Sequence, residues 1–323
     1  MMSNEVDAVA KDDTLYFQPI FKERIWGGRK LSAIYPDTVP DGPIGEAWII
    51  SAVPGSESVV AEGPHAGRTL AELYRTDRTL FPRAGAAFPL LTKILDARDR
   101  LSVQVHPDDE YARRHENQSG KTECWYVLEA DPGATLVLGH DATTREELRD
   151  AVLSGTLESL LRTVPVRRGD FVHIPAGTLH AIGGGIVLLE NQQSSDVTYR
   201  VYDYGRLDAS GRPRALHVES SLAVVAVPAE PVPVVNFADT FDIVTMVEAD
   251  AFTVRKLAVR GSFHFVNRRR RWYAATVVAG TASFNGRPIR FGDAFVIPSS
   301  VGLIDVVGEC EIVVAFLPAE DDV

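Results

Sequence analysis

A short segment with strand-like composition carries two side chains that can bind a divalent metal ion. Apolar and polar residues alternate along residues 101–107 (LSVQVHP), so Ser102, Gln104 and His106 project from one face of the expected strand. An amide oxygen and an imidazole nitrogen are both metal donors. The spacing therefore indicates that Gln104 and His106 belong to one metal site inside a small β-barrel.

A second strand-like segment, residues 121–128 (KTECWYVL), supplies a carboxylate. Its aromatic and apolar content favours a strand, in which Lys121, Glu123 and Trp125 share one face and Cys124 points the other way. Glu123 is therefore the candidate carboxylate ligand.

A third segment, residues 169–180, resembles the second motif of the cupin superfamily. That motif consists of Gly, five residues, Pro, one residue, Gly, two residues and His, and the chain meets every position with Gly169, Pro175, Gly177 and His180. The first cupin motif normally supplies two histidines one residue apart and then a glutamate. Here the glutamine described above replaces the first histidine, and a long insertion precedes the glutamate.

The expected donor set is two imidazoles, one carboxylate and one amide oxygen, from Gln104, His106, Glu123 and His180. Zinc takes such ligands at about 2.0 to 2.2 Å, so we expect one Zn²⁺ per chain, while manganese, cobalt and iron suit the same donors. Five other histidines are interpreted as packed or surface side chains: His65, His115, His140, His217 and His264. His173 is the nearest rival ligand, but its place inside a strand favours a structural role.

Composition places the chain among ordinary globular proteins. Its 323 residues are 45% hydrophobic and carry a net charge of -11, which allows a large core and argues against a nucleic-acid surface. Because no apolar run approaches the ~20 residues that span a bilayer and no signal-peptide pattern is present, we expect a cytoplasmic protein without membrane partners. The two cysteines, Cys124 and Cys310, are expected to be buried thiols. The basic run at residues 268–271 is expected to be the solvent-exposed start of a strand.

Strand-like segments dominate the chain, and two helices interrupt them. One helix is expected over residues 68–74, capped by Thr69, and a longer one from Thr143 or Thr144 to Arg162. The proline-rich residues 227–233 are interpreted as a linker. The sequence thus predicts an N-terminal metal-binding domain over residues 14–226, with a helical insertion around 143–162, and a C-terminal domain over residues 234–323.

A weak internal repeat connects the two expected domains. Residues 169–175 (GDFVHIP) are echoed by residues 292–298 (GDAFVIP), an offset of 123 residues. The same offset places Leu303 where the first copy has His180. We therefore expect the second domain to keep the fold and to lack a metal site.

With these motifs considered together, the chain resembles the class I mannose-6-phosphate isomerases, in particular the short bacterial type. The resemblance lies in six segments: residues 21–28 (FKERIWGG), 45–48 (GEAW), 88–97 (FPLLTKILDA), 101–109 (LSVQVHPDD), 120–126 (GKTECWY) and 198–200 (TYR). It implies a mainly β fold of two cupin-like jelly-roll barrels with a short helical insertion. It also implies zinc ligation by the four donors above and catalytic or substrate-binding roles for Lys121, Glu190 and Arg200.

The family reaction interconverts mannose 6-phosphate and fructose 6-phosphate, in which a proton moves between two carbons through an enediolate. Arg200 is a fixed cation that could support the oxyanion. Glu190 is expected either to act as the base or to orient a ligand, and these two roles stay open. As a base it needs burial to raise its pKa above the usual value of about 4.3. Its structural alternative is a carboxylate paired with Arg200 or Arg206.

The phosphate group of such a substrate requires cations and hydrogen-bond donors. Ser102 and Lys121 flank the ligand positions on their strands, and Arg206 follows Arg200 by six residues, so we expect Ser102, Lys121 and Arg206 to bind the phosphate. The absence of long heptad repeats favours a monomer, with a dimer as the alternative.

Two other functions compete with the isomerase. One is a cupin metalloenzyme of another reaction class, such as an iron oxygenase, which the glutamine ligand argues against. The other is a metal-dependent sugar-binding cupin without turnover, which would not need Lys121, Glu190 and Arg200 together. The physiological metal, the range of sugars and the direction of flux are left open by the sequence.

Overall fold

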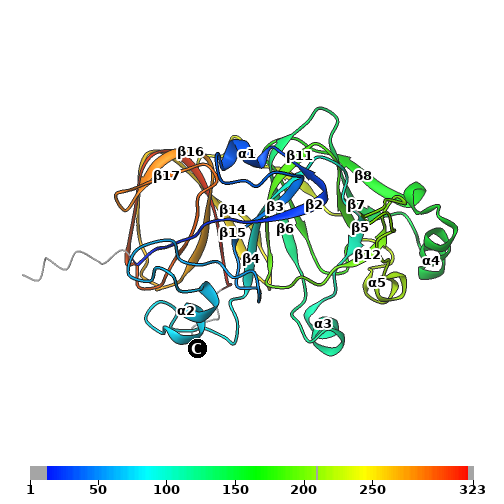
Figure 1. The fold of residues 1–323 in the computed structure, drawn as a ribbon, viewed down its shortest axis with the longest axis horizontal. Coiled ribbons are helices and arrows are strands. Elements are labelled where there is room, and N and C mark those ends of the chain that lie inside the picture. The colour runs from blue at the N-terminus through cyan, green and yellow to red at the C-terminus, as the bar shows by residue number, and fades with distance from the viewer. Residues whose placement is uncertain (1–12, 209, 319–323) are drawn as a thin grey trace, which may run out of the picture. The chain divides into compact units, whose positions relative to one another are not determined.

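Antiparallel strands dominate the computed structural model, which describes residues 13–208 and 210–318 (Figure 1). The expectation of a mainly β protein with a few short helices is confirmed. The strand pairings of the described residues leave three open sheets and do not close a continuous barrel. Within these residues, no helix is long and apolar enough to cross a membrane.

The chain divides into two compact units. Unit 1 consists of Met1–Pro19, Ile49–Pro89 and Thr240–Val323, and unit 2 consists of Ile20–Trp48 and Leu90–Asp239. These units differ from the domains expected at residues 14–226 and 234–323. The difference arises from contacts within unit 1. Leu15 pairs with Val296, and the Ser299 amide donates a hydrogen bond to the Leu80 carbonyl. Segments from early in the chain are thereby bound to C-terminal strands.

Unit 2 holds two antiparallel sheets. The first has the order β13-β9-β6-β11-β4-β2-β3, with strands β2 (Ile20–Gly28), β3 (Ile44–Ile50), β4 (Leu90–Ala97), β6 (Glu123–Ala130), β9 (Asp170–Ile174), β11 (Ile186–Gln193) and β13 (Val234–Asn236). The second has the order β12-β5-β10-β7-β8, with strands β5 (Val103–Val105), β7 (Thr135–His140), β8 (Leu161–Pro165), β10 (His180–Ile182) and β12 (Tyr199–Tyr202).

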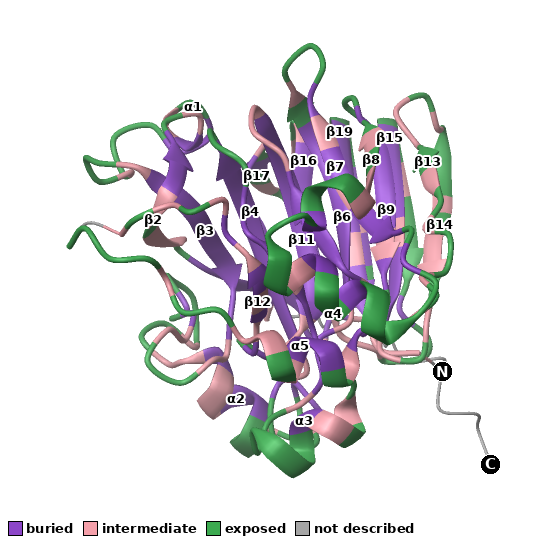
Figure 2. Cartoon of the chain, turned by 90° about the vertical axis from the view of Figure 1, so that its right-hand side faces the viewer, coloured by how far each residue is buried: buried purple, intermediate pink, exposed green. Residues whose placement is uncertain are grey.

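One hydrophobic core joins the two sheets of unit 2. It contains Trp125 and Leu188 from the first sheet and Leu136 and Ile182 from the second, all at most 1% exposed. Figure 2 shows β6, β9 and β11 buried along most of their length. Burial of apolar surface between the sheets fixes the strands that carry the candidate ligands.

The helices of unit 2 are short: α1 (Leu31–Ile34), α3 (Asp109–His115), α4 (Arg145–Ser154), the 3₁₀ turn η1 (Leu157–Leu160) and α5 (Val218–Val224). Helices α4 and α5 lie beside the sheet that contains β5 and β12 (Figure 1). The Thr144 hydroxyl accepts a hydrogen bond from the Glu147 amide, which confirms the expected cap. The expected extension to Arg162 is wrong, because Gly155 adopts a left-handed conformation (φ 75°) that ends the helix, and β8 follows.

Unit 1 contains a seven-stranded sheet with the order β1-β18-β16-β19-β15-β14, in which β17 pairs with β16. Its strands are β1 (Leu15–Tyr16), β14 (Asp242–Glu248), β15 (Thr253–Val266), β16 (Tyr273–Phe284), β17 (Arg287–Arg290), β18 (Ala294–Ile297) and β19 (Leu303–Phe316). The expected short helix is present as α2 (Leu70–Thr76), with Thr69 as its N-cap.

The internal repeat predicted from the sequence has matching local structure in the two units. Gly169 and Gly292 both have positive φ, 87° and 94°, and each precedes a short strand, β9 or β18. The two later positions differ, since His180 is fully buried whereas the Leu303 side chain is 52% exposed. In the described part of the chain, a cluster of three metal-binding side chains occurs only in unit 2.

Candidate active site

Three of the four expected metal ligands lie together at the ends of neighbouring strands in unit 2. His106 directly follows β5, Glu123 begins β6 and His180 begins β10. Their donor atoms all lie within 4.8 Å of one another, and all three side chains are at most 1% exposed. Gln104 pairs with His180 in the ladder between β5 and β10, which places it beside the same cluster.

Both histidines present one ring nitrogen to the cluster. Nδ1 of His106 lies 2.9 Å from the Val197 carbonyl, and Nδ1 of His180 lies 2.8 Å from the Thr178 carbonyl. Each Nδ1–H therefore donates to the backbone, so both Nε2 atoms face the cluster, where that of His106 lies 3.0 Å from Nζ of Lys121. Burial lowers the pKa of His106 well below its usual value and that of His180 to about 4. Both rings are thus neutral near pH 7, as ligation requires.

The Glu123 carboxylate is buried without a standard hydrogen bond among the described residues. Its Oε2 lies 2.8 Å from Nζ of Lys121 and 3.5 Å from Nε2 of His106, and its Oε1 lies 3.3 Å from Nε2 of His180. Burial raises the pKa of Glu123 to about 7, against the opposing charge of Lys121. A buried carboxylate flanked by two neutral imidazoles fits a divalent cation, which would keep it ionised.

Gln104 completes the donor set after a rotation of its amide group. Its Nε2 lies 3.4 Å from Nε2 of His180, so the amide already lies at the cluster. Turning the amide by 180° presents the oxygen, which is the donor a metal needs. The residues therefore fit a four-coordinate ion of the kind that zinc favours.

A polar cavity of about 430 Å³ opens beside the cluster. Five of the expected site residues line it: Ser102, Gln104, Lys121, Glu190 and Arg200. Arg206 is absent from the lining, because its guanidinium pairs with Asp203 and also donates to the Arg100 carbonyl. The expected phosphate contact of Arg206 thus has no support in the cavity geometry.

Glu190 pairs with a lysine and not with Arg200 or Arg206, the partners in its structural alternative. Its Oε1 lies 3.0 Å from Nζ of Lys93, and its Oε2 accepts a hydrogen bond of 3.0 Å from the Trp125 indole. Burial alone would raise the pKa of Glu190, but Lys93, Lys121 and the two donated hydrogen bonds outweigh it and lower the pKa to about 2. The raised pKa that a glutamate base needs is therefore not found.

Arg200 lies on β12 directly opposite Gln104 in the ladder with β5. Its Nη1 donates to the Ala215 carbonyl at 2.8 Å, while its buried Nε makes no hydrogen bond to the described residues. Burial and the nearby Arg214 cation lower the pKa of Arg200. A cation with an unused donor at the cavity wall can contact an anionic oxygen of a ligand.

Six further polar residues line the cavity and were not singled out from the sequence: Arg24, Glu46, Lys93, Asp196, Thr198 and Arg214. Lys93 is the single cation in the largely apolar sequence of β4. Its side chain is buried, and its Nζ lies 5.1 Å from the centre of the Trp48 ring. Arg214 pairs with Asp203 through Nε and Nη2, and its Nη1 makes no hydrogen bond to the described residues. No sequence pattern connects Arg214 with the metal motifs.

Comparison with known proteins identifies the family. The catalytic-domain model of type I phosphomannose isomerase matches residues 15–131. The mannose-6-phosphate isomerase of Streptococcus mutans is 42% identical over 308 residues, which cover 93% of this chain and 97% of that protein. Mannose-6-phosphate isomerase ManA of Bacillus subtilis is 43% identical over 314 residues, covering 94% and 99%. The crystal structure of a mannose 6-phosphate isomerase from Bacillus subtilis matches with a TM-score of 0.86 at 37% identity, over 94% of this chain and 99% of that one. The chain therefore belongs to the type I phosphomannose isomerase family.

Proposed function

We propose that the protein is a zinc-dependent isomerase that interconverts mannose 6-phosphate and fructose 6-phosphate. The observation that carries this proposal is the buried cluster of His106, Glu123 and His180 beside a cavity lined with lysine and arginine side chains. A plain binding site for a neutral sugar would not need so many buried cations. An aldose phosphate supplies the anionic groups that these cations can bind.

Four residues would hold the metal: Gln104, His106, Glu123 and His180. When bound, the ion supplies Lewis-acid polarisation of the sugar's carbonyl and hydroxyl oxygens. The chain's own cations add to that charge, because Lys121 lies within 3.0 Å of His106 and Arg200 lines the same cavity. We propose that both stabilise negative charge that develops on the sugar oxygens during proton transfer.

Of the two roles expected for Glu190, its geometry favours orientation of neighbouring groups. An ionised carboxylate with a pKa of about 2 is a weak base near pH 7. The same carboxylate holds Lys93 at 3.0 Å and the Trp125 indole at 3.0 Å, and the Trp125 ring packs edge-on against His180 at 5.4 Å. Glu190 is therefore proposed as a positioning residue for a cavity lysine and for a ligand histidine.

The phosphate is proposed to bind at the part of the cavity lined by Ser102, Lys121 and Arg214. Ser102 and Lys121 keep the roles expected from the sequence. Arg214 replaces Arg206, since Arg214 lines the cavity and retains an unused Nη1. Guanidinium groups suit phosphate oxygens because several N–H donors lie in one plane.

The proposal is tested by incubating the purified protein with mannose 6-phosphate and measuring fructose 6-phosphate. We expect turnover that disappears with a chelator and returns with one equivalent of zinc per chain. Arg200→Ala should retain the metal and lose most of its turnover. Absence of turnover at full metal loading, with sugar phosphate still bound, would indicate a binding protein instead of an isomerase. Cytoplasmic location and a monomeric state remain predictions, testable by cell fractionation and light scattering.

A further inference from the structure

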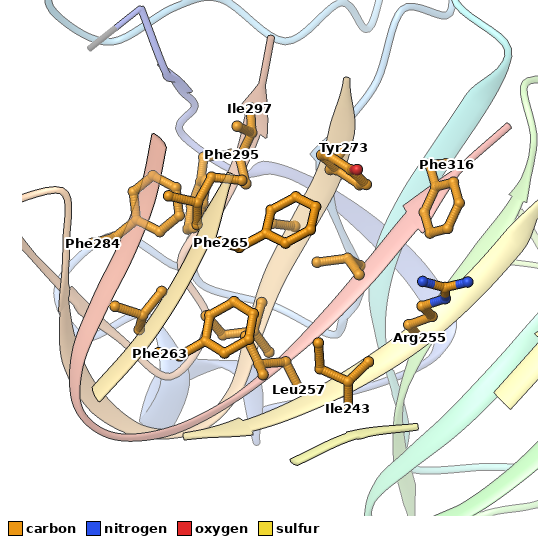
Figure 3. Close-up of a pocket in the computed structure, with 15 residues that line it drawn as sticks. Ile243, Arg255, Leu257, Phe263, Phe265, Tyr273, Phe284, Phe295, Ile297 and Phe316 are labelled. Carbon is orange, nitrogen blue, oxygen red and sulfur yellow. The ribbon is translucent and has the colours of Figure 1, made fainter. Parts of the chain in front are cut away.

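A second cavity lies in unit 1 and shares no lining residue with the cavity of the candidate active site. It measures about 100 Å³ and is lined by hydrocarbon and aromatic side chains with a single charged residue, Arg255 (Figure 3). Buried Ala275, Phe284 and Phe295 form part of its wall, while Ile243 and Phe265 are 48% and 37% exposed. The cavity is thus apolar inside and reaches the surface through exposed hydrophobic side chains.

The single charged residue lies at one side of this cavity. Figure 3 shows the Arg255 guanidinium beside Phe316, with Phe284 on the opposite side and Phe263 and Phe265 between them. The guanidinium carbon is 5.4 Å from the centre of the Phe316 ring. Its ion pair with Glu248 is loose, at 3.7 Å, and the Glu248 side chain is 68% exposed. Arg255 is therefore a cation with capacity for a closer anionic partner.

The basic run at residues 268–271 adds to the charge at this place. Arg268, Arg269 and Arg270 are exposed, as expected from the sequence, but Arg271 is half-buried and lies 5.7 Å from the same Phe316 ring. Burial raises the pKa of the lining residue Tyr273, and the cations of Arg271, Arg255 and Arg269 oppose that rise. Arg255 and Arg271 thus lie at one edge of an apolar cavity in a protein whose net charge is -11.

We propose that this cavity binds the anion of an unbranched short- to medium-chain fatty acid. The carboxylate would lie at Arg255 and the alkyl chain among the aromatic rings. An apolar wall excludes polar ligands, because a buried polar group without a hydrogen bond is costly. The arginines at its edge favour a ligand with an anionic head group. A cavity of about 150 Å³ accepts benzene, so the 100 Å³ available here admits only part of a slender alkyl chain, and the remaining methylenes would lie against the exposed Ile243 and Phe265 at its mouth.

The affinity of the cavity for a ligand should depend on the ligand's chain length and, independently, on its charge. Each methylene that enters the cavity is expected to increase affinity about fourfold, the equivalent of about 0.8 kcal/mol. Octanoate should therefore bind more tightly than hexanoate, and hexanoate more tightly than butanoate. Octanol, which has the same chain without the charge, should bind more weakly than octanoate.

The experiment is isothermal titration of the full chain with octanoate, octanol and the shorter acids. We expect saturable binding of one octanoate per chain and an affinity about tenfold lower in Arg255→Gln. The affinity of octanol should be unchanged in that variant. Arg290→Gln is the matched control, because Arg290 is an exposed arginine of unit 1 outside the cavity lining. Glu248→Gln removes the competing carboxylate and should tighten octanoate binding.

Three results would overturn the assignment: no saturable binding of octanoate, equal loss of affinity in Arg255→Gln and Arg290→Gln, or affinity that does not rise with chain length. Ala275→Leu, which fills the cavity, should abolish binding of both octanoate and octanol. If Ala275→Leu does not fold, the Arg255→Gln and Glu248→Gln titrations still decide the question, because both replaced side chains are partly exposed.

Discussion

The buried pair of Lys93 and Glu190 allows the sharpest test of how unit 2 is stabilised. The two charged atoms are 3.0 Å apart, and both side chains are at most 5% exposed. At an effective dielectric constant of about 20, a separation of 3.0 Å corresponds to about 5 kcal/mol of attraction, most of which offsets the desolvation of the two charges. Lowering the pKa of Glu190 from 4.5 to about 2 corresponds to about 3 kcal/mol in favour of the ionised form.

Replacing Lys93 with Met leaves the Glu190 carboxylate buried with the Trp125 indole as its remaining close donor. We expect Lys93→Met to lower the free energy of unfolding by about 3 to 5 kcal/mol, the usual cost of removing one partner from a buried ion pair. Glu190→Gln alone should also lower the free energy of unfolding. The double variant should lose less free energy of unfolding than the sum of the losses in the two single variants. The coupling energy is expected to be about 2 kcal/mol or more.

The measurement is urea unfolding of the four proteins, followed by tryptophan fluorescence, since Trp48 and Trp125 both contact the pair. Lys22→Met is the matched control, because Lys22 lies 5.0 Å from the same Trp48 ring and is only half-buried. It should cost under about 1 kcal/mol. A coupling energy near zero, or equal losses in Lys22→Met and Lys93→Met, would refute this account of the pair.

The pair also predicts a pH dependence with a defined sign. A carboxyl group whose pKa is lowered on folding adds stability above its unfolded pKa, and this contribution is lost as the pH falls towards the folded pKa. For Glu190 the loss should occur between about pH 4.5 and pH 2. Glu190→Gln should therefore show a smaller decrease in stability across that interval than the unchanged protein, and an identical decrease would contradict the assignment.

Three further predictions concern the candidate active site. His180→Ala should abolish stoichiometric zinc binding and activity together, as measured by metal analysis and turnover; a variant that retains one zinc would reject the ligand assignment. Arg214→Ala should raise KM for mannose 6-phosphate by tenfold or more, whereas Arg206→Ala, outside the cavity lining, should change KM less than threefold. A larger effect of Arg206→Ala than of Arg214→Ala would instead support the phosphate contact of Arg206 predicted from the sequence. Zinc added to the metal-free protein at pH 6.5 should release a proton from Glu123, whose pKa is raised to about 7 by burial, and Glu123→Gln should release none in a weakly buffered titration.

Local patterns were sufficient to predict that the candidate ligands lie together. Alternation along a strand assigned Gln104 and His106 to one face, and the spacing of Gly169, Pro175, Gly177 and His180 matched a known motif. Thr144 as a helix cap was equally local and is confirmed. These predictions rest on interactions within a few residues, which the order of side chains along the backbone specifies directly.

Features that depend on partners distant in the chain were not specified by these local patterns. Pairing of Glu190 with Arg200 or Arg206 was the structural alternative considered from the sequence, but the antiparallel pairing of β11 with β4 places Glu190 opposite Lys93, which lies 97 residues earlier. The domain boundary expected at residues 227–233 is likewise based on local composition. The structure groups residues 49–89 in the same compact unit as the C-terminal strands, and no local pattern indicates this. Register and docking of this kind depend on which hydrophobic faces pack together.

The sequence by itself determined the donor atoms, the motif positions and the family resemblance, since each depends on residue type and short spacing. Only the tertiary structure decided which charges are neutralised and which stay available to a ligand: Lys93 is paired with Glu190, Arg206 is paired with Asp203, and Arg214 reaches the cavity. The physical reason is that burial and the charge on a neighbouring strand set the protonation state of a side chain, and both arise only when distant segments fold together.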